Sequence, residues 1–195
     1  MAPDSRRPRP VDRPSLTDDP PAEAGVGRRP AILVIGLGNP ILGDDGVGWR
    51  VAERVREWVA AAGRSDVDVD CLALGGLSLM ERLIGYDRAI VIDATQAGQA
   101  AGAVARYELE DLPDYSSFNS AAPHDASLQT ALRLGRALGA RLPRSVTIIG
   151  VEAERLYDFT EALTPPVEAA VPGAAQLVIA TVRAFSPEVQ SDGLP

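Results

Sequence analysis

The sequence contains no lysine, since all 19 of its basic residues are arginines. This absence excludes a Schiff base, a catalytic lysine and the lysine of a phosphate-binding P-loop. There is only one histidine, His124, so a Ser-His-Asp triad would have to use it, while a three-histidine zinc site and an HExxH protease motif are excluded. The only cysteine, Cys71, cannot form an internal disulfide, and we therefore expect a cytoplasmic protein.

A run of 18 apolar residues is also absent, so the sequence predicts no membrane span. The formal net charge of −8 argues against nucleic acid as the main partner, because binding a phosphate backbone needs concentrated positive charge. What is present is an ordinary globular composition, with 46% hydrophobic and 24% charged residues. A chain of 195 residues with this composition is long enough for one domain with its own core.

Proline content sets the beginning of the chain apart from the rest. Seven of the 16 prolines fall within residues 1–30, which carry almost no large apolar side chains. Such a segment cannot bury enough surface to offset the entropy of ordering, so residues 1–30 are predicted to be a disordered arm. The folded domain is predicted to cover residues 31–185, and residues 186–195 are predicted to form a flexible tail.

Short apolar runs typical of buried strands alternate with stretches whose apolar residues recur at helical spacing. The predicted strands cover residues 31–35, 67–73, 89–92 and 145–150, with an extended edge segment at 103–109. The predicted helices cover residues 47–62, 77–84, 125–140 and 164–185, the last of them bent at Pro172. This order predicts an α/β fold: a three-layer sandwich with a mostly parallel central sheet flanked by helices, and ligands bound outside the carboxyl ends of the strands.

Three places at that edge carry side chains suited to acid-base or metal chemistry. The glycine-rich loop after the first strand contains Asp44 and Asp45, Asp93 ends the third strand, and His124 precedes a helix. The loop does not complete a dinucleotide-binding G-x-G-x-x-G motif, because Ile41 stands where the third glycine is needed. Each residue also has a structural interpretation: one of the paired aspartates as a helix cap, Asp93 as a turn cap, and His124 as a structural histidine.

Two carboxylates and one imidazole at the same edge would make a three-point site for a divalent metal, with positions open for a substrate group or water. Mixed oxygen and nitrogen ligands suit Zn, Ni, Co or Mn, and the absence of a cysteine ligand argues against a structural zinc site. Asp125 lies beside His124 and either orients its ring or caps the following helix.

Five motifs, between about Ala31 and Phe185, together resemble the [NiFe]-hydrogenase maturation endopeptidases. The most specific is the block G-x-G-N-x-x-x-x-D-(D/E)-x-x-G, which residues 36–48 match throughout. The other four follow in chain order: Asp93 closing an apolar strand, His124 before a leucine-rich helix, Gly150-Val-Glu152, and Leu163-Thr-Pro-Pro-Val-Glu168.

This resemblance implies an endopeptidase that removes a short C-terminal extension from the precursor of the hydrogenase large subunit after nickel insertion. It also implies that the acidic residue Asp45 binds a metal together with Asp93 and His124. The nickel is expected to come with the precursor, and another divalent metal such as zinc can occupy the site in the isolated protein. The family has no accepted serine or cysteine nucleophile, so no catalytic nucleophile is assigned.

Two features depart from the family pattern, and two alternatives stay open. Leu74-Gly-Gly-Leu-Ser-Leu79 stands where relatives carry a polar Gly-Thr element, and the arm over residues 1–30 has no counterpart. A non-catalytic metal-binding chaperone would use the same three ligands. Peptidyl-tRNA hydrolases share a Gly-Leu-Gly-Asn-Pro opening, here residues 36–40, but need a histidine soon after it, and residues 41–70 contain none.

Overall fold

A computed structural model describes residues 31–73, 75–112, 127–156 and 158–185. The chain forms one five-stranded sheet with the strand order β2-β1-β3-β5-β4. Four strands are parallel: β1 (Ile32–Leu37), β2 (Val67–Leu72), β3 (Arg88–Thr95) and β5 (Ser145–Glu152). The fifth, β4 (Val104–Glu108), pairs antiparallel with β5 at the edge, where the sequence predicted an extended segment.

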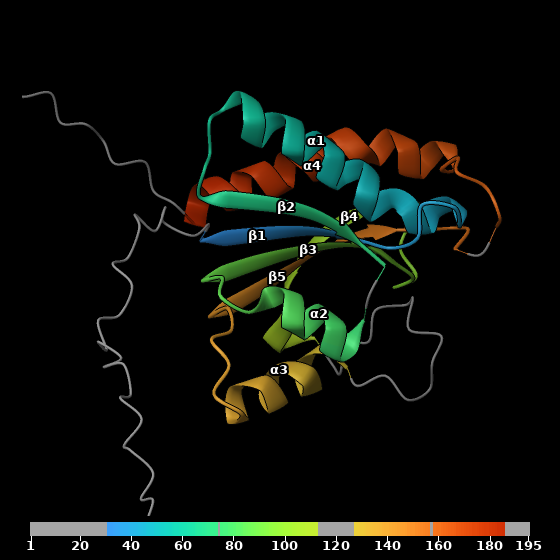
Figure 1. Cartoon of the computed structure of the whole chain (residues 1–195). Helices are drawn as coiled ribbons and strands as arrows, with labels where there is room; N and C mark the ends of the chain where they lie inside the picture. The colour runs from blue at the N-terminus through green and yellow to red at the C-terminus, as the bar shows by residue number, and fades with distance from the viewer. Residues whose placement is uncertain (1–30, 74, 113–126, 157, 186–195) are drawn as a thin grey trace, which may run out of the picture.

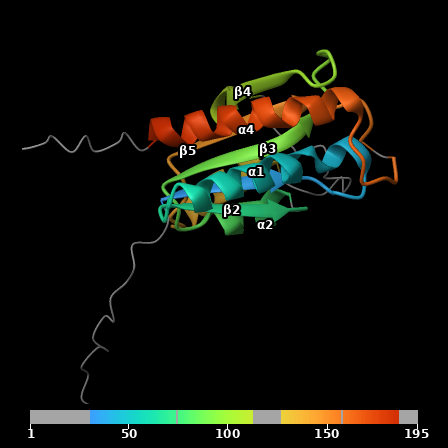
Figure 2. The same cartoon turned by 90° about the horizontal axis from the view of Figure 1, so that it is seen from above.

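Helices cover both faces of the sheet, which confirms the predicted three-layer α/β sandwich (Figure 1). On one face, α1 (Val47–Ala61) and α4 (Pro165–Phe185) lie side by side (Figure 2). The opposite face carries α2 (Gly76–Leu83) and α3 (Leu128–Ala137), which contact each other. Two short 3-10 turns, η1 (Gly43–Gly46) and η2 (Leu109–Asp111), complete the described elements. The predicted arm and tail lie outside the described residues.

Strand β1 is at the centre of the core because all six of its residues are buried. Its side chains alternate between the two faces of the sheet. Ile32 and Val34 pack in the cluster under α1 and α4, whereas Leu33, Ile35 and Leu37 pack in the cluster under α2 and α3. This packing on both sides explains why the sequence of the strand is a continuous apolar run.

The predicted apolar stripe of α1 faces the sheet. Val47, Val51 and Val55 are fully buried, and Trp58 and Val59 are packed against the same cluster while partly exposed. Helix α4 is long and apolar enough to cross a membrane by length and composition. Its valines belong to the same cluster as those of α1, so packing within the domain accounts for its apolar character. Pro172 lies inside α4, which the structure describes as one helix over its whole length.

Several element boundaries differ from the sequence prediction, and those nearest the candidate site matter most. Strand β3 does not end before Asp93 but continues to Thr95, because β5 extends far enough to pair with it through Glu152. Asp93 therefore lies inside a strand, opposite Gly150, and does not cap a turn after the strand. The described part of α3 begins at Leu128 with Ser127 as its N-cap, while Asp125 is outside the described residues.

Strand β1 was expected to end at Gly36, but it passes through this residue because Gly36 pairs with both β2 and β3. Gly36 does not end the strand; its lack of a side chain allows α1 to pack close to β1. A Cβ atom on Gly36 would overlap the carbonyl oxygen of Gly48, and a Cβ atom on Gly48 would overlap the carbonyl oxygens of Leu37 and Ile92. The first turn of α1 therefore packs backbone against backbone on β1 and β3.

Replacing Gly48 with Ala should lower the free energy of unfolding by at least about 2 kcal/mol, because the new methyl group meets backbone atoms that cannot rotate away. Gly173→Ala is the matched control, since Gly173 is also helical and a Cβ atom there meets nothing within 4 Å. This control should be neutral or up to about 1 kcal/mol more stable. Urea unfolding of both variants measures the difference in stability. If the two variants were equally stable, α1 would not pack as closely on β1 and β3 as described.

Candidate functional site

The loop between β1 and η1 is held by its own hydrogen bonds, and these account for much of the glycine-rich block. Gly38 adopts a positive φ of 128°, which allows the chain to turn away from the strand. The Asn39 side chain accepts a hydrogen bond from the Ile41 N–H at 3.2 Å. The Asn39 N–H in turn donates to Oδ2 of Asp45 at 2.6 Å. The block thus folds back on itself and fixes one oxygen of the Asp45 carboxylate.

Asp45 and its neighbour Asp44 are both buried, yet they do different things. Asp45, which is 1% exposed, contacts its own loop as described above. Asp44 is fully buried and accepts hydrogen bonds from the segment between β5 and α4. Its donors are the N–H groups of Glu154 (3.1 Å), Arg155 (3.0 Å) and Thr164 (2.6 Å), together with the Thr164 hydroxyl (2.9 Å).

The helix-cap interpretation of the aspartate pair is wrong. The N-cap of α1 is Gly46, and no side chain caps that helix end. The pair lies instead in η1, one short turn before the helix. The Asp44 carboxylate binds backbone N–H groups 110 to 120 positions away in the sequence. Sequence spacing could not reveal these contacts because they are long-range.

Asp93 is fully buried on β3. By the alternation of side chains along a strand, it lies on the same face as Ala89 and Val91, the face covered by α2 and α3. Turn η1, which carries Asp45, contacts β3. The two carboxylates that the sequence selected are thus buried in neighbouring elements at the carboxyl edge of the sheet.

His124, the third predicted ligand, lies outside the described residues, as does its neighbour Asp125. Within the described ranges, no group of three or more potential ligand side chains is assembled. The complete ligand set of Asp45, Asp93 and His124 therefore stays a prediction. Helix α3, which follows His124 in the sequence, leads toward the start of β5, and its own beginning therefore lies toward the carboxyl edge.

Glu152 is a buried acidic residue at this edge that is not among the predicted site residues. It is 5% exposed and lies at the end of β5. Its carboxylate accepts hydrogen bonds from the segment after β3: the N–H groups of Ala97 (3.0 Å), Gly98 (2.7 Å) and Gln99 (3.0 Å), and the Thr95 hydroxyl (3.1 Å). The sequence did contain a signal for this residue, because Glu152 belongs to the Gly150-Val-Glu152 motif and follows a predicted buried strand.

Burial alone would raise the pKa of Glu152, since it disfavours the charged form. The hydrogen bonds from Ala97, Gly98, Gln99 and Thr95 outweigh this effect, so the pKa of Glu152 is lowered from its ordinary value. Glu152 is therefore ionised at neutral pH and acts as an acceptor of hydrogen bonds.

Cys71 shows no sign of an activated nucleophile. Burial raises the pKa of its thiol, and the nearby Arg56 guanidinium, 3.5 Å from the sulfur, only partly opposes this. A thiol with a raised pKa carries little of the reactive thiolate at neutral pH. This agrees with the absence of an assigned nucleophile.

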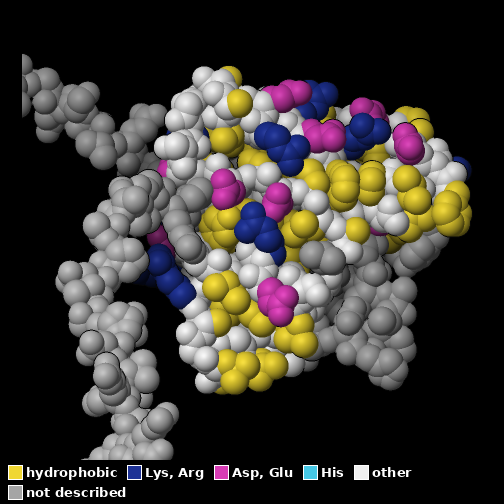
Figure 3. Space-filling view, in the orientation of Figure 1, with side chains coloured by type: hydrophobic (Ala, Val, Ile, Leu, Met, Phe, Trp, Pro, Cys, Tyr) yellow, Lys and Arg dark blue, Asp and Glu magenta, His cyan; other side chains and the backbone are white. Residues whose placement is uncertain are grey.

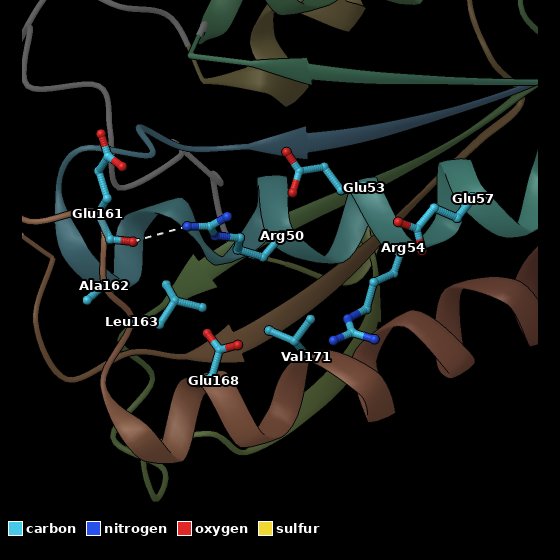
Figure 4. Close-up of a pocket in the computed structure, with 9 residues that line it drawn as sticks. All are labelled: Arg50, Glu53, Arg54, Glu57, Glu161, Ala162, Leu163, Glu168 and Val171. Atoms are coloured by element: carbon cyan, nitrogen blue, oxygen red, sulfur yellow. Dashed lines mark hydrogen bonds between the residues drawn. The ribbon is translucent and has the colours of Figure 1, made fainter.

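The surface beside η1 is hollowed in two places. A depression of about 350 Å³ lies against Gly43 and Asp44, and a groove of about 630 Å³ runs between α1 and the start of α4. Figure 4 shows this groove, with Leu163 and Val171 as apolar lining and Arg50 donating to the Glu161 carbonyl oxygen at 3.3 Å. The two hollows share Ala162 and Leu163, so the groove continues toward η1.

Hydrophobic side chains gather at the right-hand end of the molecule in Figure 3, over the loops that follow β1 and β5. The loop after β1 contains Ile41, which is 48% exposed, and the loop after β5 contains Phe159, which is 88% exposed. Backbone hydrogen bonds join the two loops, from the Gly43 N–H to the Thr160 carbonyl (2.7 Å) and from the Thr160 N–H to the Ile41 carbonyl (3.1 Å).

Fold and site together define a class: a three-layer α/β protein whose buried carboxylates gather at the carboxyl edge of a mostly parallel sheet. The model of the hydrogenase maturation protease family matches residues 32–181, which is most of the chain. The chain belongs to this family, and the family match favours that assignment over a peptidyl-tRNA hydrolase.

Individual relatives agree with this assignment. The hydrogenase expression/formation protein HupD of Thiocapsa roseopersicina is 31% identical over 175 residues, covering 85% of this chain and 77% of that protein. The hydrogenase 2 maturation protease of Escherichia coli strain K12 is 29% identical over 153 residues, covering 78% of this chain and 90% of that protein. Among solved structures, the hydrogenase maturating endopeptidase HybD from E. coli superposes with a TM-score of 0.60 at 25% identity, covering 80% of this chain and 93% of that one.

Replacing Glu152 with Gln should lower the free energy of unfolding at neutral pH by about 2 kcal/mol, because an amide cannot accept all four donors. This loss of stability should become smaller in acid. The ionised Glu152 stabilises the fold fully at a pH above the pKa of this residue in the unfolded chain, near 4.5. The stabilisation disappears as the pH falls through the lower pKa that Glu152 has in the folded protein.

Urea unfolding of the wild type and Glu152→Gln between about pH 7 and pH 3 measures both effects. Glu110→Gln removes an exposed carboxylate and should change stability by less than about 0.5 kcal/mol. A stability difference that stays constant over this pH range would contradict the assigned role of the Glu152 charge.

Proposed function

We propose that this chain is an endopeptidase that removes the C-terminal extension of a [NiFe]-hydrogenase large-subunit precursor after nickel has been inserted. The observation that carries the proposal is the burial of Asp45 and Asp93 at the carboxyl edge of the sheet, in a chain that matches the maturation protease family over residues 32–181. The likeness to an endopeptidase of E. coli supports the reaction type. We propose the cytoplasm as the place of reaction, since the substrate is an immature precursor.

The donor chemistry fits a divalent metal. Asp45 and Asp93 supply carboxylate oxygens, and His124 would add an imidazole nitrogen, a mixed set that suits nickel or zinc. In this proposal, the nickel belongs to the precursor and is recognised as part of the substrate. A divalent metal supplies positive charge that polarises a nearby carbonyl group.

The chain's own residues would then bind and orient the substrate. Asp45 and Asp93 are held on rigid elements, and such positioning can account for a large part of a rate enhancement by bringing the scissile bond into a reactive geometry. No serine or cysteine is assigned as nucleophile, and in this proposal a water molecule attacks the carbonyl carbon. The carbon–oxygen bond forms, the peptide carbon–nitrogen bond breaks, and the departing amine takes up a proton from the attacking water.

Asp45→Asn, Asp93→Asn and His124→Ala should each slow processing of a nickel-loaded precursor by at least about 100-fold, because each removes a group that positions the scissile bond. Loss of the C-terminal extension, followed by mass spectrometry, measures the rate. Asp111→Asn, at an exposed position in η2, is the control and should process at the wild-type rate.

The same assay separates the two functions. If the wild type binds the nickel-loaded precursor without shortening it, the chain is a metal-binding chaperone and not a peptidase. If the wild type cleaves and His124→Ala cleaves equally fast, the ligand assignment is wrong while the peptidase function stands.

A further inference from the structure

Among the described residues, the buried acidic side chains lie together at one edge of the molecule. In the part of the chain that the structure describes, all four buried carboxylates, Asp44, Asp45, Asp93 and Glu152, lie at or beside the carboxyl ends of the strands. The proposed function uses two of them. Because burying an ionised carboxylate is unfavourable unless hydrogen bonds replace its water, the other two require a reason of their own.

We infer that Asp44 and Glu152 are positioning residues, which hold the segments that carry Asp45 and Asp93 in a fixed relation to each other. This inference rests on the proposed function, because it assigns the two residues to that same site. Neither residue is inferred to touch the substrate or the metal.

Asp44 fixes η1, the turn that carries Asp45. Its four accepted hydrogen bonds all come from residues between the end of β5 and the start of α4. The backbone adds a further bond in the same direction, from the Asp44 N–H to the Arg155 carbonyl oxygen at 3.0 Å. Asp45 is the next residue in the chain, so its backbone cannot shift without disturbing this set of bonds.

Glu152 fixes the segment that follows Asp93 on β3. Its carboxylate accepts three consecutive N–H groups, from Ala97 to Gln99, and the Thr95 hydroxyl. Backbone bonds again reinforce the contact, with the Ala153 N–H donating to the Thr95 carbonyl oxygen at 2.8 Å. The strand end beyond Asp93 is thereby attached to the end of β5.

Both sets of bonds meet at one place, the carboxyl end of β5. Glu152 is its last residue, and Glu154 and Arg155, which donate to Asp44, follow two and three positions later. Asp45 and Asp93 are thus connected through the same short segment, although they come from separate elements. An ionised carboxylate suits this task, because it only accepts hydrogen bonds and offers about four acceptor sites.

Asp44→Asn and Glu152→Gln test the inference at a temperature where both remain folded. Each should lower kcat for precursor cleavage about 10- to 100-fold with KM changed less than about 2-fold, the range expected when a group supporting a metal ligand is lost. The affinity of the isolated protein for Ni²⁺, measured by calorimetry, should fall by a similar factor, on the order of 10- to 100-fold.

A gentler pair of variants separates positioning from general destabilisation. Thr164→Val removes the hydroxyl that donates to Asp44, and Thr164→Ser restores it, so kcat should fall in the first and recover in the second. Thr181→Val is the matched control. Thr181 is also a buried threonine, and its hydroxyl donates to the Leu177 carbonyl oxygen within α4, away from the site, so kcat should stay at the wild-type value.

A third readout needs neither metal nor precursor. The Asn39 N–H donates to Asp45, so its hydrogen exchange reports directly on whether Asp45 is held in place. Exchange at Asn39 should become at least about 10-fold faster in Asp44→Asn and stay unchanged in Thr181→Val. Unchanged exchange at Asn39 in Asp44→Asn would overturn the inference, even if the wild type cleaves the precursor. Failure of the wild type to cleave would overturn the proposed function. The hydrogen exchange of Asn39 would then still decide whether Asp44 holds Asp45 in place.

Discussion

The direct packing of α1 on the backbone of β1 and β3 is the contact on which the site depends. Gly48 lies against the carbonyl oxygens of Leu37 and Ile92, and Gly36 faces α1 from the strand. Because no side chain separates the two layers here, η1 sits at the carboxyl edge of the sheet in contact with β3. Asp45 reaches that edge only because the helix starts so close to the strands.

The four buried carboxylates at this edge differ in their surroundings. Asp44 and Glu152 each accept four hydrogen bonds from distant parts of the chain. These bonds replace the water that each carboxylate loses on burial, and they connect separate segments of the chain. Asp45 lies beside Asp44 on η1, and Asp93 lies on β3, whose end is bonded to Glu152. The other two, Asp45 and Asp93, are the carboxylate ligands of the metal site proposed above, in a chain of the hydrogenase maturation protease family.

The family motifs gain a physical meaning from these contacts. Gly150-Val-Glu152 supplies the carboxylate that holds the segment after β3, and Thr164 of the Leu163–Glu168 motif supplies two of the four donors to Asp44. Motifs that are far apart in the sequence therefore serve one site. The third predicted ligand of that site, His124, lies outside the described residues, and its place stays a prediction.

The sequence by itself determined the layered α/β fold, because apolar runs buried on both faces and stripes at helical spacing are local patterns that survive folding. Position after predicted strands also selected Asp93 and the pair Asp44 and Asp45, and the resemblance to the maturation endopeptidases singled out Asp45 as the ligand. Neither revealed what Asp44 does, because the two aspartates are neighbours in the same local context. Only the tertiary structure decided this, because the donors to Asp44 come from residues more than 100 positions away, and hydrogen bonds over such distances leave no periodic trace in a single sequence. The same reason hid the role of Glu152 and the extension of β3 past Asp93, both of which depend on how far β5 continues beside it.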